Sequence, residues 1–130
     1  MRIALDRLYD SVALLQSARV FKIAAFTKRL LTLAKDHADD VLLEIENDLL
    51  ENPERGPVIQ GTAGVRKARV ADPTRGKGKS GGFRYMYYYI ERDGQIFLPM
   101  IFSKNEQADL TAQQKKLLTQ AILGLREARK

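Results

Sequence analysis

The sequence lacks cysteine altogether and contains a single histidine, His37. The absence of cysteine excludes disulfide bonds, thiolate nucleophiles and cysteine-ligated metal sites together. No apolar run approaches the roughly 20 residues that cross a bilayer, and Asp6 and Asp10 fall where a signal peptide is continuously apolar. These absences predict a cytoplasmic protein with no membrane segment, no cofactor and no metal.

The length and composition of the chain indicate one globular domain. The chain has 130 residues, of which 45% are hydrophobic and 29% are charged, and this composition is typical of folded soluble proteins rather than disordered chains. Below roughly 150 residues a chain seldom forms a second hydrophobic core. We therefore expect a single domain over residues 1–130, without internal repeats.

Charge is distributed unevenly along this domain. Residues 36–54 contain eight acidic side chains and no lysine or arginine, whereas residues 55–84 contain eight basic side chains and one acid, Asp72, a net charge of +7. A compact basic segment suits a polyanionic partner, because lysine and arginine displace the counterions condensed on nucleic acid. The alternative is a solvated surface that happens to be basic.

The spacing of apolar residues predicts helices at both ends of the chain. We expect helices over residues 4–17 and 26–35, and a third helix with Leu42, Ile45 and Leu49 on one face that ends at Asn52 and Pro53. Thr111 and Gln114 have the spacing of a capping box for a last helix. Residues 1–17 form an extra amphipathic helix in this prediction.

Between these helices the sequence has the alternation and aromatic content of β-strands. The expected strands cover residues 18–26, 64–71, 83–91 and 96–102, with a hairpin turn at residues 92–95. Pro99 predicts that the last strand lies at an edge or contains a bulge. Helices, a three-stranded antiparallel meander and a final helix define an α+β fold.

Familiar catalytic motifs do not fit the sequence. Gly78-Lys79-Ser80 resembles the end of a phosphate-binding loop, but the motif requires a glycine at position 73, where Pro73 stands, and a helix where a strand is expected. A Ser-His-Asp triad would have to use His37, which falls in the turn between two helices. Paired carboxylates occur only along the acidic helix and indicate a polar surface.

A group of basic residues remains in the stretch RGKGKSGGFRYMYYYIERDG, residues 75–94, and in the strand before it. Lys67 and Arg69 share one face of their strand, because side chains alternate with period two. Lys77 and Lys79 lie on the connecting loop, and Arg84 begins the next strand. With only Asp72 nearby, these cations predict an external anion, while the stripe of Phe83, Tyr85, Tyr87 and Tyr89 is more typical of core than of base stacking.

Cations without an evident base suffice to cleave RNA, because the substrate supplies its own nucleophile, the 2′-hydroxyl. The protein then aligns this hydroxyl with the phosphorus, stabilises the added negative charge and assists proton transfer to the leaving oxygen. DNA lacks the hydroxyl, so this arrangement selects RNA.

Two stretches, NPERGPVIQGTAGVRKARVADPTRGKGKSGGFRYMYYY at residues 52–89 and MIFSKNEQADLTAQQKK at residues 100–116, resemble the HigB branch of the RelE/ParE toxin superfamily. The resemblance covers roughly residues 19–125 and rests on three motifs in order. It implies a RelE-like fold, with N-terminal helices packed on a small antiparallel sheet and a C-terminal helix. It also implies a type II toxin that cleaves mRNA on the ribosome and is inhibited by a HigA-like helix-turn-helix antitoxin, through which alone it reaches operator DNA.

The resemblance also implies roles for individual residues. Lys67 and Arg69 match cations that bind substrate and transfer protons, Arg84 matches the arginine of the scissile phosphate, and Lys104 lies beside the cleft. We expect RNA or phosphate binding from Arg66, Lys77, Lys79 and Asn105. Asn105 and Thr111 stand where well-known members have an arginine and a tyrosine, so no general acid or base is assigned.

Two other functions stay open at this point. A ParE-like protein inhibits DNA gyrase without cutting RNA, but such proteins generally lack the cations that match Lys67, Arg69 and Arg84. A non-catalytic RNA-binding member is the third possibility, and Asn105 is the residue that favours it.

Overall fold

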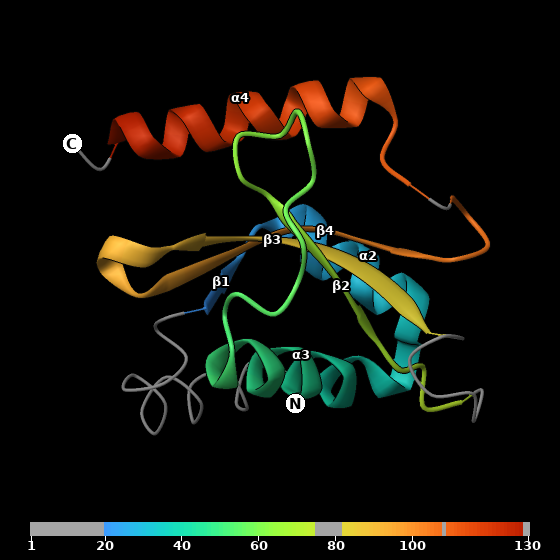
Figure 1. The fold of residues 1–130 in the computed structure, drawn as a ribbon. Helices are drawn as coiled ribbons and strands as arrows, with labels where there is room; N and C mark the ends of the chain where they lie inside the picture. The colour runs from blue at the N-terminus through green and yellow to red at the C-terminus, as the bar shows by residue number, and fades with distance from the viewer. Residues whose placement is uncertain (1–19, 75–81, 108, 129–130) are drawn as a thin grey trace.

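The computed structural model describes residues 20–74, 82–107 and 109–128, so the predicted helix over residues 1–17 lies outside the described residues. The elements follow in the order β1 (Val20–Lys22), α2 (Ala24–Ala34), η2 (Lys35–His37), α3 (Ala38–Glu51), β2 (Arg66–Val70), β3 (Phe83–Ile90), η4 (Glu91–Asp93), β4 (Gln95–Ser103) and α4 (Ala112–Ala128). The sheet lies between α3 on one side and α4 on the other (Figure 1). None of the helices in this part of the chain is long and apolar enough to cross a membrane.

The sheet has four strands in the order β1-β4-β3-β2. Strands β2, β3 and β4 form the predicted antiparallel meander, which confirms the α+β fold class. The first strand was predicted too long: β1 has three residues and pairs in parallel with β4, and α2 begins at Ala24, inside the range expected to be strand. Alanine at positions 24 and 25 favours helix, and Phe26, Leu30 and Ala34 then share one buried helical face.

Pro99 lies in the interior of the sheet, because β4 has β1 on one side and β3 on the other. The edge alternative is therefore wrong, and the bulge alternative is confirmed. In the ladder between β3 and β4, Leu98 and Pro99 together stand opposite one residue, Tyr87. A bulge interrupts the hydrogen-bond ladder, so proline's missing N–H is tolerated there. The extra residue also brings Leu98 and Ile101 into the same core.

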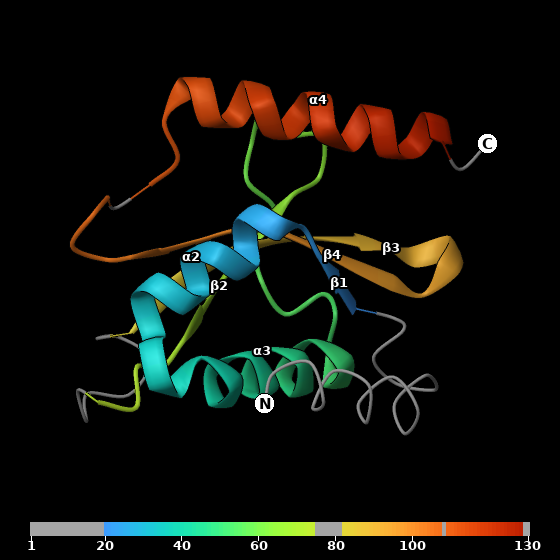
Figure 2. The same ribbon diagram turned by 180° about the vertical axis from the view of Figure 1, so that it is seen from behind.

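Each face of the sheet has its own apolar core, with α3 and α4 on opposite sides in both views (Figures 1 and 2). Phe83, Tyr85 and Tyr87 pack with residues of α2 and α3, whereas Met86 packs with residues of α4. Tyr85 and Tyr87 have no exposed surface, and burial raises the pKa of both hydroxyls. The aromatic stripe of β3 is therefore core, as the sequence indicated, and these two rings are not available to stack on bases.

The ends of the elements follow their sequence signals. His37 lies in η2 between two helices, and α3 ends at the C-cap residue Asn52. The hairpin between β3 and β4 turns through η4 and Gly94, which has a left-handed φ of 63°. Before α4, the Gln114 N–H donates to Thr111 Oγ1 over 3.1 Å and the Thr111 N–H donates to Gln114 Oε1 over 2.9 Å. The predicted capping box is confirmed.

Candidate nucleic-acid interface

The pairing of β2 with β3 brings three basic side chains to one face of the sheet. Arg69 stands directly opposite Arg84, and Lys67 stands directly opposite Met86. Residues opposite each other in an antiparallel pair point to the same face, and Met86 belongs to the core that α4 covers. Lys67, Arg69 and Arg84 therefore share the α4 side of the sheet, as the alternation of the sequence indicated.

These three side chains line a cleft of about 490 Å³, together with Arg55, Gly56, Pro57, Ala68, Met86 and Asp109. Strands β2 and β3 provide most of the lining, residues 55–57 provide a second side, and Asp109 comes from the segment between β4 and α4. Sites for small ligands commonly measure about 300 to 1,000 Å³. The cleft is therefore large enough for a nucleotide and its phosphate.

Residues 55–57 reach the cleft because Gly56 lies directly against β2. The Lys67 N–H donates to the Pro57 carbonyl over 3.1 Å, and the Gly56 N–H donates to the Tyr87 hydroxyl over 2.9 Å. A Cβ at position 56 would lie 2.1 Å from the Lys67 carbonyl oxygen, so only glycine permits this approach. The backbone of Lys67 is thus fixed by the segment that also lines the cleft.

Arg69 and Arg84, which face each other across β2 and β3, form no ion pair with a carboxylate within residues 20–74, 82–107 and 109–128. The Nε of Arg84 is buried and has no hydrogen-bond partner in the same part of the chain. A buried donor without an acceptor costs about 1 to 3 kcal/mol, and like charges directly opposite each other destabilise a sheet. An anion bound between Arg69 and Arg84 would offset both effects.

The expectation that Asp72 is the only acid among these cations is wrong. Asp109 lines the cleft, and its Oδ1 lies 3.9 Å from Lys67 Nζ. Asp72 instead accepts hydrogen bonds from the N–H and the hydroxyl of Thr74, over 3.0 and 2.7 Å. Asp109 follows β4, so a charge count over residues 55–84 could not include it. The Asp109 and Lys67 side chains are 72% and 43% exposed, and such exposed pairs contribute only about 0 to 1 kcal/mol.

Arg55 is a fourth cation of the cleft that the sequence analysis did not assign. Its Nη1 lies 3.2 Å from Asp48 Oδ1 of α3, so this guanidinium is already paired. The sequence did contain a signal, because Arg55 is the first basic residue after the acidic segment and directly precedes Gly56.

Arg66 lies apart from the other cations. It stands opposite Tyr87, on the face that packs against α2 and α3. Its Nη1 donates to the carbonyls of Glu54 and Gly56, over 3.2 and 2.7 Å. These contacts hold the guanidinium against the segment between α3 and β2, and Arg66 is not among the residues that line the cleft.

Lys104 and Asn105 lie in the turn that follows β4, and both are exposed. Strand β4 ends at Ser103, which pairs with Phe83, the neighbour of Arg84. The turn is therefore at the same end of the sheet as the arginine pair, although neither of its two residues lines the cleft. Lys77 and Lys79 lie outside the described residues, and their phosphate contacts stay predictions.

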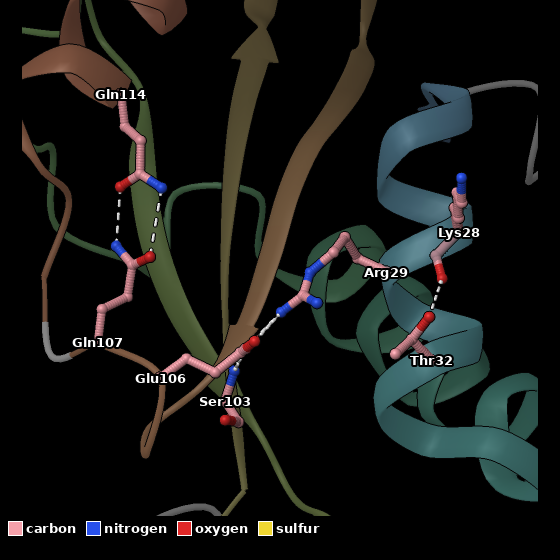
Figure 3. Close-up of polar contacts among 7 residues, drawn as sticks. All are labelled: Lys28, Arg29, Thr32, Ser103, Glu106, Gln107 and Gln114. Carbon is pink, nitrogen blue, oxygen red and sulfur yellow. Dashed lines mark hydrogen bonds and ion pairs between the residues drawn. The ribbon is translucent and has the colours of Figure 1, made fainter.

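The turn after β4 is held from two sides (Figure 3). The Glu106 carboxylate accepts a hydrogen bond from the Ser103 N–H over 2.8 Å and pairs with Arg29 of α2. The pKa of Glu106 is lowered by that N–H first and by the Arg29 guanidinium as well. Gln107 and Gln114 exchange amide hydrogen bonds of 2.7 and 3.2 Å. Glu106 is thus held against α2, and Gln107 is held against α4.

Comparison with known proteins gives a likeness of fold. No protein-family model matches the chain. A solved structure of an arginine double mutant of the Escherichia coli toxin RelE in the free state aligns with a TM-score of 0.49 and 16% identity, over 68% of this chain and 85% of that one. A crystal structure of the isolated E. coli RelE toxin aligns with a TM-score of 0.48 and 15% identity, over 78% of this chain and 96% of that one. The sequence motifs and the cleft, rather than this likeness, support a function.

Proposed function

We propose that this chain is the toxin of a type II toxin-antitoxin system of the HigB kind, and that it cleaves mRNA on the ribosome. The chief support is the cleft in which Arg69 stands directly opposite Arg84, with Lys67 beside them. The three motifs of residues 52–89 and 100–116 support the HigB branch, because they occur together and in order.

In the proposed reaction the RNA 2′-hydroxyl attacks the adjacent phosphorus. Arg84 and Arg69 bind the scissile phosphate and stabilise the negative charge that grows on it in the transition state. Arginine suits this role because its planar guanidinium donates two parallel hydrogen bonds to phosphate oxygens. Lys67 lies at the side of the arginine pair, where its ammonium group can protonate the leaving 5′-oxygen.

Further contacts extend from this centre. Lys104 and Asn105, at the same end of the sheet, would bind the RNA backbone beside the scissile phosphate, and Lys77 and Lys79 are expected to do so from their loop. Arg66 has its own carbonyl partners on the other face, so we leave it out of the proposed RNA contacts.

A toxin of this kind needs an inhibitor. We propose a cognate HigA-like antitoxin with a helix-turn-helix domain, which also carries the toxin to operator DNA, and we expect both proteins in the cytoplasm with the ribosome. The support for this partner is the sequence resemblance.

The test is induction of the protein in growing bacteria, followed by mapping of transcript 5′ ends. We expect new ends within translated regions, and we expect Arg84→Ala to remove both these ends and the growth arrest. Lys28→Ala, on the exposed surface of α2, serves as the matched control and should behave like the parent. Intact transcripts with broken chromosomes would instead identify a gyrase inhibitor, and an Arg84→Ala variant as toxic as the parent would contradict the assigned role.

A further inference from the structure

The proposed reaction releases the proton of the 2′-hydroxyl, and the roles proposed for Lys67, Arg69 and Arg84 leave open which group accepts it. In that proposal Arg69 and Arg84 bind the phosphate and Lys67 donates the proton to the leaving oxygen. The cleft lining contains four basic residues and four residues without a titratable side chain, and its remaining member is Asp109. Asp109 is therefore the one carboxylate among the described lining residues.

The position of Asp109 suits proton transfer. Its Oδ1 lies 3.9 Å from Lys67 Nζ, and a lysine that binds a phosphate oxygen lies about 2.7 to 2.9 Å from it. In a reactive alignment the 2′-oxygen lies about 3 to 3.5 Å from the phosphorus. A phosphodiester bound by Lys67 in the cleft would therefore lie beside this carboxylate.

The backbone carbonyl of Asp109 is linked to α4 by hydrogen bonds. The Gln107 Nε2 donates to the Asp109 carbonyl over 2.7 Å, and Gln107 is itself paired with Gln114 of α4. Thr111 then closes the capping box with Gln114. Gln107 and Gln114 thus fix the position of the Asp109 backbone carbonyl relative to α4.

We infer that Asp109 is a catalytic residue of the proposed ribonuclease and acts as its general base. The inference rests on the proposed function. The O2′–H bond breaks and its proton passes to the Asp109 carboxylate, while the O2′–P bond forms. The P–O5′ bond breaks and the leaving oxygen takes a proton from the Lys67 ammonium. The products are a 2′,3′-cyclic phosphate and a 5′-hydroxyl, and transfer of the proton from Asp109 to Lys67 restores the protein.

Single-turnover cleavage on ribosomes programmed with a short mRNA tests this inference. We expect Asp109→Asn to slow cleavage by about 10² to 10⁴-fold, the usual contribution of general acid–base catalysis, and Asp109→Glu to recover part of the rate. Affinity is measured separately with the same mRNA carrying a 2′-deoxynucleotide at the cleavage site. Asp109→Asn should bind it as tightly as the parent or more tightly, because a negative charge has left the cleft.

Asp40→Asn is the matched control, because the Asp40 side chain is 79% exposed on α3, and it should cleave at the parental rate. The Asp109 side chain is 72% exposed, so the asparagine variant should keep the parental melting temperature. Cleavage by Asp109→Asn at the parental rate would overturn the inference and leave the proposed function standing. If Asp109→Asn cleaves at the parental rate and binds the 2′-deoxy mRNA more tightly than the parent, Asp109 is only a counter-ion of Lys67. A parent that cleaves no mRNA would overturn the proposed function and the inference with it.

Discussion

At the scale of single residues, the cleft combines groups that help to bind an anion and hinder folding. Arg69 and Arg84 are directly opposite each other, and the Arg84 Nε is buried without a partner in the described chain. Functional sites often retain such unfavourable contacts, and stability is then gained when they are removed. The arginine pair is therefore expected to cost stability as long as no anion is bound.

Arg84→Gln should raise the free energy of unfolding by about 0.5 kcal/mol, since it removes one of two like charges that oppose each other across strands. Urea denaturation at low ionic strength measures this change. The gain should shrink in 1 M salt, where the screening length is about 3 Å. Lys28→Gln, at an exposed position of α2, is the control and should leave the midpoint unchanged. A clear loss of stability in Arg84→Gln would contradict this description of the pair.

The candidate site could be predicted in part from local pattern. Period-two alternation predicted that Lys67 and Arg69 share one face. The same rule places Arg66 on the other face, although RNA or phosphate binding was also expected of Arg66. Asp109 and Arg55 reach the cleft only through the path of the chain after β4 and before β2. Such positions depend on tertiary contacts. Neither the alternation of side chains in a strand nor a charge count over one segment can predict them.

At the scale of elements, β2 is a short strand that needs its neighbouring segment. Residues 56–59 run along its outer edge, where the Lys67 N–H donates to the Pro57 carbonyl and the Ile59 N–H donates to the Val65 carbonyl over 2.7 Å. This segment occupies the edge of the sheet and fixes the strand that carries Lys67 and Arg69. Gly56 is the residue that makes the approach possible.

Gly56→Ala should lower the free energy of unfolding by about 1 to 3 kcal/mol, the usual cost of overpacking. The added Cβ would lie 2.1 Å from the Lys67 carbonyl oxygen, so the segment would have to move off β2. Gly124→Ala is a matched control of opposite sign, because nothing lies within 4 Å of a Cβ at that position of α4. Gly124→Ala should raise the free energy of unfolding by up to about 1 kcal/mol, because alanine has a higher helix propensity than glycine. Urea unfolding of both variants measures the difference, and equal stabilities would refute the close approach.

Most elements could be predicted because their signals are local. The aromatic strand, the hairpin, the acidic helix and the capping box each follow from neighbouring residues. The parallel pairing of β1 with β4 could not be predicted in this way, because a three-residue strand depends on its partner rather than on its own sequence. For the same reason the sequence left open whether Pro99 lies at an edge or in a bulge.

At the scale of the whole molecule, an acidic helix and the basic cleft lie on opposite sides of the sheet. The acidic helix α3 lies on one side of the sheet and α4 on the other (Figure 1). Lys67, Arg69 and Arg84 are on the α4 side. A nucleic-acid backbone is attracted to the cations of the cleft and repelled by the carboxylates of α3. This arrangement and the cleft together support the proposed binding of an RNA backbone.

The salt dependence of binding to single-stranded RNA tests this claim most directly. If about four phosphates are contacted, the logarithm of the affinity should fall with the logarithm of the salt concentration with a slope of about −3. The variant with Arg69→Ala and Arg84→Ala loses two of these contacts, so its slope should be about −1.5. A flat salt response of the parent, or the same slope in parent and variant, would contradict the claim that these arginines bind the RNA backbone.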